Sequence, residues 1–345
     1  MSDTPSRNNS DKILEIDGIP VRSEQVEFAE DELIKCSDCG RSTPPNRLDC
    51  LYCGAEISGN DTDKKLKPVL RPPEEGNEGF SIVATDASGW NSDLIHLAAG
   101  MTRLAEEDIR ALTSTGSPIP IGYGGSEKAV ALAADRLREA GLKVKIIRDS
   151  EFVDTSAHSR LRGLSFDEGK KLVLIHFNND KVTVLGPDDI SLIVVGLVLE
   201  NRFEASEKHK RKGLDKVLNS TEVSADEVYI DFYTRDSSQA FRIQASGFDF
   251  SFLGERKELL AVGNLEKTID AIRKFATNAV FDNNYRGIHS KLDLIWKIEH
   301  REDTKSIKRS GFGSFEKKRV VTSSNLDQFN KYSKLQWMIR CGEDK

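Results

Sequence analysis

Cys36-Ser-Asp-Cys39-Gly40 and Cys50-Leu-Tyr-Cys53-Gly54 decide how the N-terminal part of this chain folds. Each Cys-x-x-Cys pair can turn both sulfurs toward one ion, and two such pairs complete a tetrahedron of thiolates. The glycine after each pair permits the positive φ with which the backbone turns back under a metal. The spacing predicts one zinc ion, with iron or a redox dithiol as alternatives. Its expected ligands are Cys36, Cys39, Cys50 and Cys53.

A closed set of four thiolates predicts a structural role for the ion, because no coordination position stays open for water. Residues 34–57 resemble zinc ribbons, which implies two short hairpins around the ion. A unit this small cannot bury a core, so metal binding supplies its folding free energy, on the order of 10–16 kcal/mol. Between the two pairs, Arg41 and Arg47 are balanced by Asp38 and Asp49. That balance favours a protein-docking or purely structural ribbon over one that binds nucleic acid.

The length, net charge and cysteine content of the chain predict a multi-domain protein of a reducing compartment. Its 345 residues suggest two or three domains, and a net charge of −6 gives no overall sign of nucleic-acid binding. Four of the five cysteines fall in one short segment, which favours metal over disulfides. The N-terminus has no apolar signal segment, and the run Leu192–Leu199 is too short to cross a bilayer. We therefore expect a cytoplasmic protein without a transmembrane segment.

Changes in composition divide the chain into six parts and predict a multi-domain α+β fold. Proline, glycine and charge dominate the linker, whereas alternating apolar patterns mark the two larger domains. The expected parts are an acidic, largely disordered N-terminus at 1–30, a zinc ribbon at 31–57, a linker at 58–78, a small α/β domain at 79–149, an antiparallel β-rich domain closed by a helix at 165–290, and a basic tail with a terminal helix at 291–345.

The small α/β domain is predicted from one strong helix and its neighbours. Ser126–Ala140 has apolar residues at three- and four-residue spacing and ends at Gly141. Phe80–Ala84 predicts a strand, and Gly122–Ser126 predicts a flexible turn with Ser126 as the helix cap. A second helical stretch, at 94–112, is expected to break near Gly100, with Thr102 capping its second half.

This domain resembles the C-terminal domain of the bacterial ribosomal stalk protein. The similarity rests on Leu112–Pro118 and on the helix–glycine–strand segment Glu127–Ile146. It implies a small protein-interaction domain. The family's lysine-bearing segment for translation factors has no match at Arg103–Arg110, where charges are mixed. No binding residue is therefore carried over.

The β-rich domain is predicted from successive apolar strands. Lys171–Phe177 should pair with Lys181–Leu185, and Ile190–Leu199 should be central because it is almost continuously apolar. Further strands are expected at Val228–Tyr233 and Phe241–Ile243, before a core stripe and a helix capped by Asn264; the stripe is Phe248, Phe250 and Phe252. Six antiparallel strands followed by one helix resemble pleckstrin-homology-like domains, which bind peptides or lipid headgroups. No sequence motif supports that resemblance.

Two basic segments give the chain a second predicted binding function. The first lies in a long predicted loop before the Val228 strand and could meet phosphate groups or anionic lipid, or could simply be a solvated loop between Glu207 and Asp215. Residues 300–345 carry eleven basic and six acidic side chains, a net of +5. Their final helix should dock onto the body through Phe329, Tyr332, Leu335 and Trp337. The candidate binding residues of the loop are Lys208, Lys210, Arg211 and Lys212.

No catalytic signature is found in the sequence. There is neither a nucleophile elbow nor a His-Glu-x-x-His motif, and the six histidines are scattered, with His176 expected to be packed in a strand. Phe248–Gly254 and Asn325–Trp337 resemble segments of uncharacterised bacterial proteins that combine a zinc ribbon with this β-rich region, a resemblance that implies no activity. We therefore expect a non-enzymatic adaptor that binds an unknown protein. The alternatives are a nucleic-acid or anionic-lipid binder using 208–212 and the tail, and an enzyme with a cryptic site.

Overall fold

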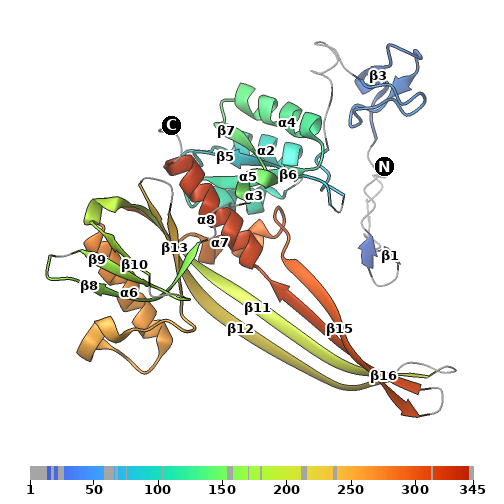
Figure 1. Ribbon diagram of the computed structural model, residues 1–345. Helices are drawn as coiled ribbons and strands as arrows, with labels where there is room; N and C mark the ends of the chain where they lie inside the picture. The colour runs from blue at the N-terminus through green and yellow to red at the C-terminus, as the bar shows by residue number, and fades with distance from the viewer. Residues whose placement is uncertain are drawn as a thin grey trace, which may run out of the picture. The chain divides into compact units, whose positions relative to one another are not determined.

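The protein consists of two compact units, Met1–Lys67 and Pro68–Lys345, which are described separately (Figure 1). The predicted α+β class is confirmed, since helices and antiparallel or mixed sheets occur together. The computed structural model describes residues 14–16, 19–21, 27–57, 66, 69–74, 76–102, 104–153, 158–169, 171–178, 181–210, 216–235, 239–311 and 314–341, of which 14–16, 19–21, 207–210, 216–219, 304–311 and 314–317 are described by their backbone alone.

The first unit contains two small antiparallel hairpins. One pairs β1 (Leu14–Ile16) with β2 (Ile19–Val21), inside the segment predicted to be disordered; the rest of 1–26 lies outside the described residues. The other pairs β3 (Ile34–Lys35) with β4 (Ser42–Thr43), after the 3-10 turn η1 (Glu30–Glu32). The apolar side chains buried in the ribbon are few: Ile34, Cys36, Cys50 and Ile57. A module with so small a core needs another source of stability.

The second unit begins with a three-stranded antiparallel sheet. The strand predicted at Phe80–Ala84 is confirmed as β5 (Phe80–Ala84), which is the central strand and is buried along its whole length. Leu70, in the segment predicted to be a linker, is also buried, and Arg71 accepts a hydrogen bond from the backbone of Gly125. The flanking elements are α2 (Ser92–Thr102), α3 (Glu106–Thr113), β6 (Ile119–Gly124), α4 (Glu127–Glu139), β7 (Val144–Arg148) and α5 (Asp149–Phe152).

Helix α4 confirms the clearest helix predicted from the sequence. The Ser126 hydroxyl accepts a hydrogen bond from the Ala129 backbone at 3.3 Å, and Gly141 follows the helix with φ of +93°. The predicted flexible turn before it is wrong, because Gly122 and Gly124 lie in strand β6. A Cβ at Gly124 would come within 2.9 Å of the Val130 side chain. Glycine is needed there so that helix and strand can pack closely.

The predicted break between α2 and α3 exists, but its capping residue was wrong. Thr102 is the last residue of α2, and its hydroxyl donates to the carbonyl of Ala98 at 2.8 Å. The N-cap of α3 is Ala105. The acidic residues Glu106 and Glu107 lie in the first turn of α3, where their negative charges interact favourably with the positive end of the helix dipole.

The larger sheet of this unit is mixed rather than purely antiparallel. Its strands follow the order β10-β9-β8-β13-β12-β11-β16-β15, and β14 pairs with β11. The predicted hairpin of β9 and β10 is confirmed, but β8–β13 and β11–β14 pair in parallel. The bounds are β8 (Ser159–Phe166), β9 (Leu172–His176), β10 (Val182–Leu185), β11 (Ile190–Lys210), β12 (Lys216–Thr234), β13 (Ala240–Gln244), β14 (Val280–Asp282), β15 (Glu299–Gly311) and β16 (Ser314–Ser324).

Helix α6 (Ala261–Phe275) covers the apolar face of this sheet. Phe248 and Phe250 are buried in the shared core and Phe252 packs against it, as the sequence predicted, although 251–256 form a 3-10 turn (η3, Ser251–Arg256) instead of a strand. Asn264 does not cap the helix. It lies inside α6, and its amide exchanges hydrogen bonds of 2.7 and 2.8 Å with the backbone of Glu258.

Four strands extend beyond the core as a narrow arm (Figure 1). We define the arm as the parts of β11, β12, β15 and β16 that cover 200–210, 216–227, 299–311 and 314–324. The sequence predicted a long loop before the Val228 strand and no strands in the tail, but 200–210, 216–227, 299–311 and 314–324 form strands. Residues 220–226 are exposed on both faces of the sheet. The arm therefore lacks the alternating apolar pattern by which strands are recognised.

Helix α8 (Leu326–Arg340) lies between the small sheet and the large one, with α7 (Tyr285–Leu292) beside it (Figure 1). Of the four predicted docking residues, Phe329, Tyr332 and Leu335 are fully buried and Trp337 is half-buried. The Gln336 side chain donates to the carbonyl of Pro118 at 2.7 Å. The segment predicted as a basic tail thus supplies an edge hairpin and a central helix of the second unit.

Candidate functional site

The four cysteines of the ribbon form one compact cluster of sulfurs. All four Sγ atoms lie within 4.8 Å of one another. The Cys36–Cys53 sulfur distance is 3.7 Å and the Cys39–Cys50 distance is 3.6 Å. A tetrahedron with sulfurs about 2.3 Å from a central ion has edges of about 3.8 Å, whereas a disulfide needs about 2.05 Å. The cluster can therefore hold one metal ion.

The backbone builds the two halves of this cluster in the same way. In the first, Cys36 N–H donates to the Arg41 carbonyl at 2.9 Å and Gly40 N–H donates to the Cys36 carbonyl at 3.0 Å. In the second, Cys50 N–H donates to the Ala55 carbonyl at 2.8 Å and Gly54 N–H to the Cys50 carbonyl at 3.0 Å. The glycines have φ of +70° and +73°, and a Cβ there would meet nothing within 4 Å. Glycine is required at these positions because of their positive φ, and not because a larger side chain would clash with a neighbour.

The surroundings of the sulfurs favour a bound cation. The backbone N–H of Tyr52 points to the Cys50 sulfur at 3.5 Å and lowers the pKa of Cys50 to about 6. At Cys53 the Ala55 N–H lowers the pKa, but burial and the neighbouring sulfurs outweigh it and raise the pKa. Four thiols this close cannot all ionise without a positive charge between them. The donor set thus fits a tetrahedral, thiolate-bound metal.

Two apolar side chains are exposed beside the metal cluster. Leu51 and Tyr52, between the second pair of cysteines, are 49% and 56% exposed. The guanidinium of Arg41 lies 5.0 Å from the centre of the Tyr52 ring. Aromatic and apolar groups held rigidly at a surface are typical of protein contacts. The sequence marked the cysteines of this segment but not these two residues.

The described half of the predicted basic site lies on a strand of the arm. Lys208 and Lys210 belong to β11, whereas Arg211 and Lys212 lie outside the described residues. Lys208 is paired with Lys216 on β12 and with Glu316 on β16, and Glu316 is paired in turn with Lys308 on β15. The register thus joins two basic segments that are about a hundred residues apart in sequence.

The far end of the arm concentrates positive charge in a chain that is acidic overall. Its described stretches 205–210, 216–219, 304–311 and 314–319 contain nine lysines and arginines against two glutamates, a net charge of +7. The whole chain carries −6. We call this end of the arm the basic tip. The basic tip arises because strand pairing brings separate basic segments together, and not from a single basic run in the sequence.

A buried polar network lies beneath α8, and sequence analysis missed it. Asp231 is fully buried and accepts hydrogen bonds of 2.6 and 2.7 Å from Arg242 and of 2.7 Å from Ser333. Burial alone would raise the pKa of Asp231, but the charges of Arg242 and His158 outweigh it and hold that pKa below its usual value. The Ser333 hydroxyl, which donates to Asp231, is also bonded to the Tyr233 hydroxyl at 2.9 Å, so the network extends from α8 to β12.

A second buried carboxylate connects the two sheets through α8. Asp282 accepts hydrogen bonds from Ser117 and Tyr332 at 2.8 Å and from Arg340 at 3.1 Å. Asp282 is the last residue of β14, Ser117 lies just before β6 of the small sheet, and Tyr332 and Arg340 lie on α8. No local pattern could have indicated the network, because its members are up to 223 residues apart. Its role is to fix α8 in place.

His176 is the histidine for which the sequence predicted a packed position. His176 is buried in β9, where its Nε2 lies 2.9 Å from the Thr183 hydroxyl, which confirms the predicted packed histidine. Among the described residues, the four cysteines are the only metal-ligand group found.

Comparison with known proteins gives no further assignment. No protein-family model, curated protein or solved structure matches the chain. The resemblances to the stalk domain and to pleckstrin-homology-like domains therefore stay interpretations of residue patterns. No helix in the described part of the chain is long and apolar enough to cross a membrane.

Proposed function

We propose that the protein is a non-enzymatic adaptor whose ribbon is folded around one structural zinc ion. The convergence of four sulfurs at tetrahedral spacing supports this proposal. Bound zinc would supply the folding free energy of a segment with almost no apolar core. Because all four positions are filled by protein thiolates, the ion would neither bind nor activate water. Unoxidised thiolates also suit a reducing compartment such as the cytoplasm.

Metal analysis of the purified chain tests this proposal. We expect one zinc ion per chain, no colour from iron–thiolate bonds, and loss of the metal when any ligand cysteine becomes serine. Cys341→Ser is the matched control, because this fifth cysteine lies far from the cluster in sequence and is free. A protein without stoichiometric metal, or one that keeps its metal after Cys39→Ser, would contradict the proposal.

The adaptor role is supported by the exposed pair Leu51 and Tyr52. Zinc would hold both side chains on a rigid turn, so that a partner could bind them with little loss of side-chain entropy. We expect the double substitution Leu51→Ser/Tyr52→Ser to keep zinc and the ribbon fold while abolishing cross-linking of a protein partner. Arg47→Ser is the control, being on the same ribbon outside this pair. Cross-linking of the partner that survives at moderate salt but fails in the double variant fits an apolar protein contact. Unchanged cross-linking in the double variant contradicts a contact through Leu51 and Tyr52.

A second candidate function is nucleic-acid binding by the basic tip. The observation in its favour is the register that brings Lys208, Lys216 and Lys308 into one row, together with Glu316. A narrow β ribbon can enter a nucleic-acid groove, and lysines and arginines bind phosphates by releasing counterions. A projecting ribbon offers little area to a flat membrane, so we favour nucleic acid over anionic lipid.

Fluorescence anisotropy with a labelled DNA duplex and a labelled single-stranded RNA tests this function. We expect binding that weakens steeply between about 50 and 200 mM salt, and a smaller salt slope in Lys308→Gln/Arg309→Gln. The charge-matched control is Lys128→Gln/Lys145→Gln, on α4 and β7. Flotation with phosphatidylserine vesicles separates the lipid alternative. Binding to vesicles alone, or equal loss in both variants, would contradict nucleic-acid binding by the tip.

A further inference from the structure

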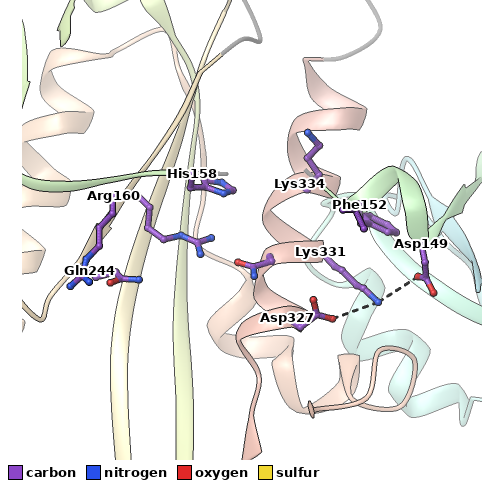
Figure 2. A pocket seen from close by; sticks show the side chains of 11 residues that line it. Asp149, Phe152, His158, Arg160, Gln244, Asp327, Lys331 and Lys334 are labelled. Carbon is purple, nitrogen blue, oxygen red and sulfur yellow. Dashed lines mark hydrogen bonds and ion pairs between the residues drawn. The ribbon is translucent and has the colours of Figure 1, made fainter. Parts of the chain in front are cut away.

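A cavity of about 430 Å³ lies between α8 and the strands β8 and β13, with α5 at its margin (Figure 2). It belongs to the second unit and is separate from both the ribbon and the basic tip. His158, Arg160 and Arg242 line it from the strand side, Lys331 and Lys334 from α8, and Asp149 from α5. Its volume suits a small metabolite, since ligand cavities commonly measure about 300–1,000 Å³.

Cations are present on both walls of this cavity. The lining includes four lysines and arginines and one histidine, against the two carboxylates Asp149 and Asp327. Lys331 lies between these carboxylates, 3.4 Å from Asp149 and 3.6 Å from Asp327 (Figure 2). The acidic side chains of the lining are thus engaged with one lysine. Counting also the buried Asp231 that pairs with Arg242, four lysines and arginines stand against three carboxylates, a net charge of +1.

The cations on the strand side are held in fixed positions. Arg242 is buried and bonded through two nitrogens to Asp231. Arg160 stacks on Phe177, 4.0 Å from the ring centre, and donates to the Ser246 carbonyl at 2.6 Å. Side chains fixed in this way bind an anion without losing further rotamer freedom.

Unsatisfied polar atoms also gather around this cavity. Four buried side-chain nitrogen or oxygen atoms among the described residues have no hydrogen-bond partner, and two of them, Arg160 Nε and Asn330 Oδ1, belong to lining residues. A third, Trp337 Nε1, belongs to the ring beneath the ammonium of Lys334, at 4.4 Å. Buried atoms without partners are rare and call for a cause. Among these three, the Arg160 Nε–H is the donor on a lining residue that an anion could accept from, whereas Asn330 Oδ1 is an acceptor and Trp337 does not line the cavity.

We propose that this cavity binds a small phosphate-bearing ligand, about the size of a nucleoside monophosphate, between the cations of the strands and the lysines of α8. Phosphate suits the site because arginine forks and lysine ammoniums both bind its oxygens strongly. The apolar wall at Phe152 would take the uncharged part of the ligand. Since α8 contacts both sheets, the ligand would fix the small sheet against the large one.

Isothermal titration of the zinc-loaded full chain tests the site with three probes: inorganic phosphate, adenosine monophosphate and adenosine. We expect the two phosphate-bearing probes to bind at one per chain and adenosine not to bind. Arg160→Gln and Lys334→Gln should each weaken binding about tenfold or more, the effect of removing one charge-assisted hydrogen bond. Lys257→Gln, on an exposed lysine outside the cavity, is the control.

Two further measurements keep the result interpretable. Near-ultraviolet circular dichroism should show that Lys334→Gln keeps the native fold, in case Arg160→Gln does not. Lys308→Gln/Arg309→Gln at the basic tip should leave phosphate binding unchanged. Three results would each overturn the proposal. The first is that neither phosphate probe binds, the second is equal affinity in Lys334→Gln and the native chain, and the third is loss of binding in the tip variant.

Discussion

The ribbon and the second unit are built in opposite ways. The ribbon gathers four ligand atoms from eighteen residues, Cys36–Cys53, around a point where a cation fits. The second unit joins residues far apart in sequence through α8, as in the Ser333–Asp231 and Gln336–Pro118 hydrogen bonds. One region depends on local chemistry and a metal, and the other on burial and a polar network. Substitutions should therefore affect one region without the other.

The largest expected effect is that of Cys50→Ser, which should unfold the ribbon alone. Losing the ion removes a folding free energy of about 10–16 kcal/mol at neutral pH. All three tryptophans, Trp90, Trp296 and Trp337, lie in the second unit, so their fluorescence reports its unfolding separately. We expect proteolysis within 31–57 to become fast while the tryptophan transition stays unchanged. Zinc lost without local unfolding, or a lower tryptophan transition, would contradict this independence.

The second effect is that of Asp231→Ala, which should destabilise the second unit and leave zinc bound. The substitution leaves Arg242 buried without its carboxylate, at a cost of about 3–5 kcal/mol. Urea unfolding followed by tryptophan fluorescence measures it. Asp327→Ala is the control, because its carboxylate is 56% exposed and pairs within one helix, where a salt bridge contributes less than about 1 kcal/mol. Similar losses in both variants would show that the buried network is not special.

A smaller effect is expected where α8 packs on β11. A Cβ at Gly196 would lie 2.2 Å from the ring of Phe329, so Gly196→Ala should cost about 1–3 kcal/mol through overpacking. Adding Phe329→Leu should make the double variant more stable than the sum of the single effects predicts. Gly100→Ala, within helix α2 and with open space around it, should be neutral or stabilising by up to about 1 kcal/mol. Strictly additive changes in the free energy of unfolding would contradict the contact between Gly196 and Phe329.

The smallest effect concerns pH and the buried His176. Burial, helped by Lys181, lowers the pKa of this histidine in the folded state. The unfolded chain therefore binds the proton more readily, so the stability is complete above about pH 6.5 and falls as the pH drops below that value. His176→Gln should lose less stability than the native chain between pH 7 and pH 5. The exposed His96→Gln serves as control, and an unchanged pH dependence in the His176 variant would contradict the assignment.

Sequence reasoning succeeded where a structure leaves a local pattern. Helix α4 was found from its apolar spacing with Ser126 and Gly141 at its ends, and the β9–β10 hairpin from two adjacent apolar runs. It failed for the arm, where residues 220–226, for example, are exposed on both faces of the sheet and therefore show no apolar alternation. It also failed for residues 301–324, whose pairing partner β11 lies about a hundred residues earlier.

The sequence by itself determined the metal cluster, since the identity, spacing and glycines of two Cys-x-x-Cys pairs suffice to bring four sulfurs together. Only the tertiary structure decided where the other charges lie. It combined two basic segments into one tip, buried Asp231 and Asp282 under α8, and opened a cationic cavity beside that helix. The physical reason is range: metal ligation acts within a turn or two of chain, whereas strand pairing and burial join residues whose separation no local pattern encodes.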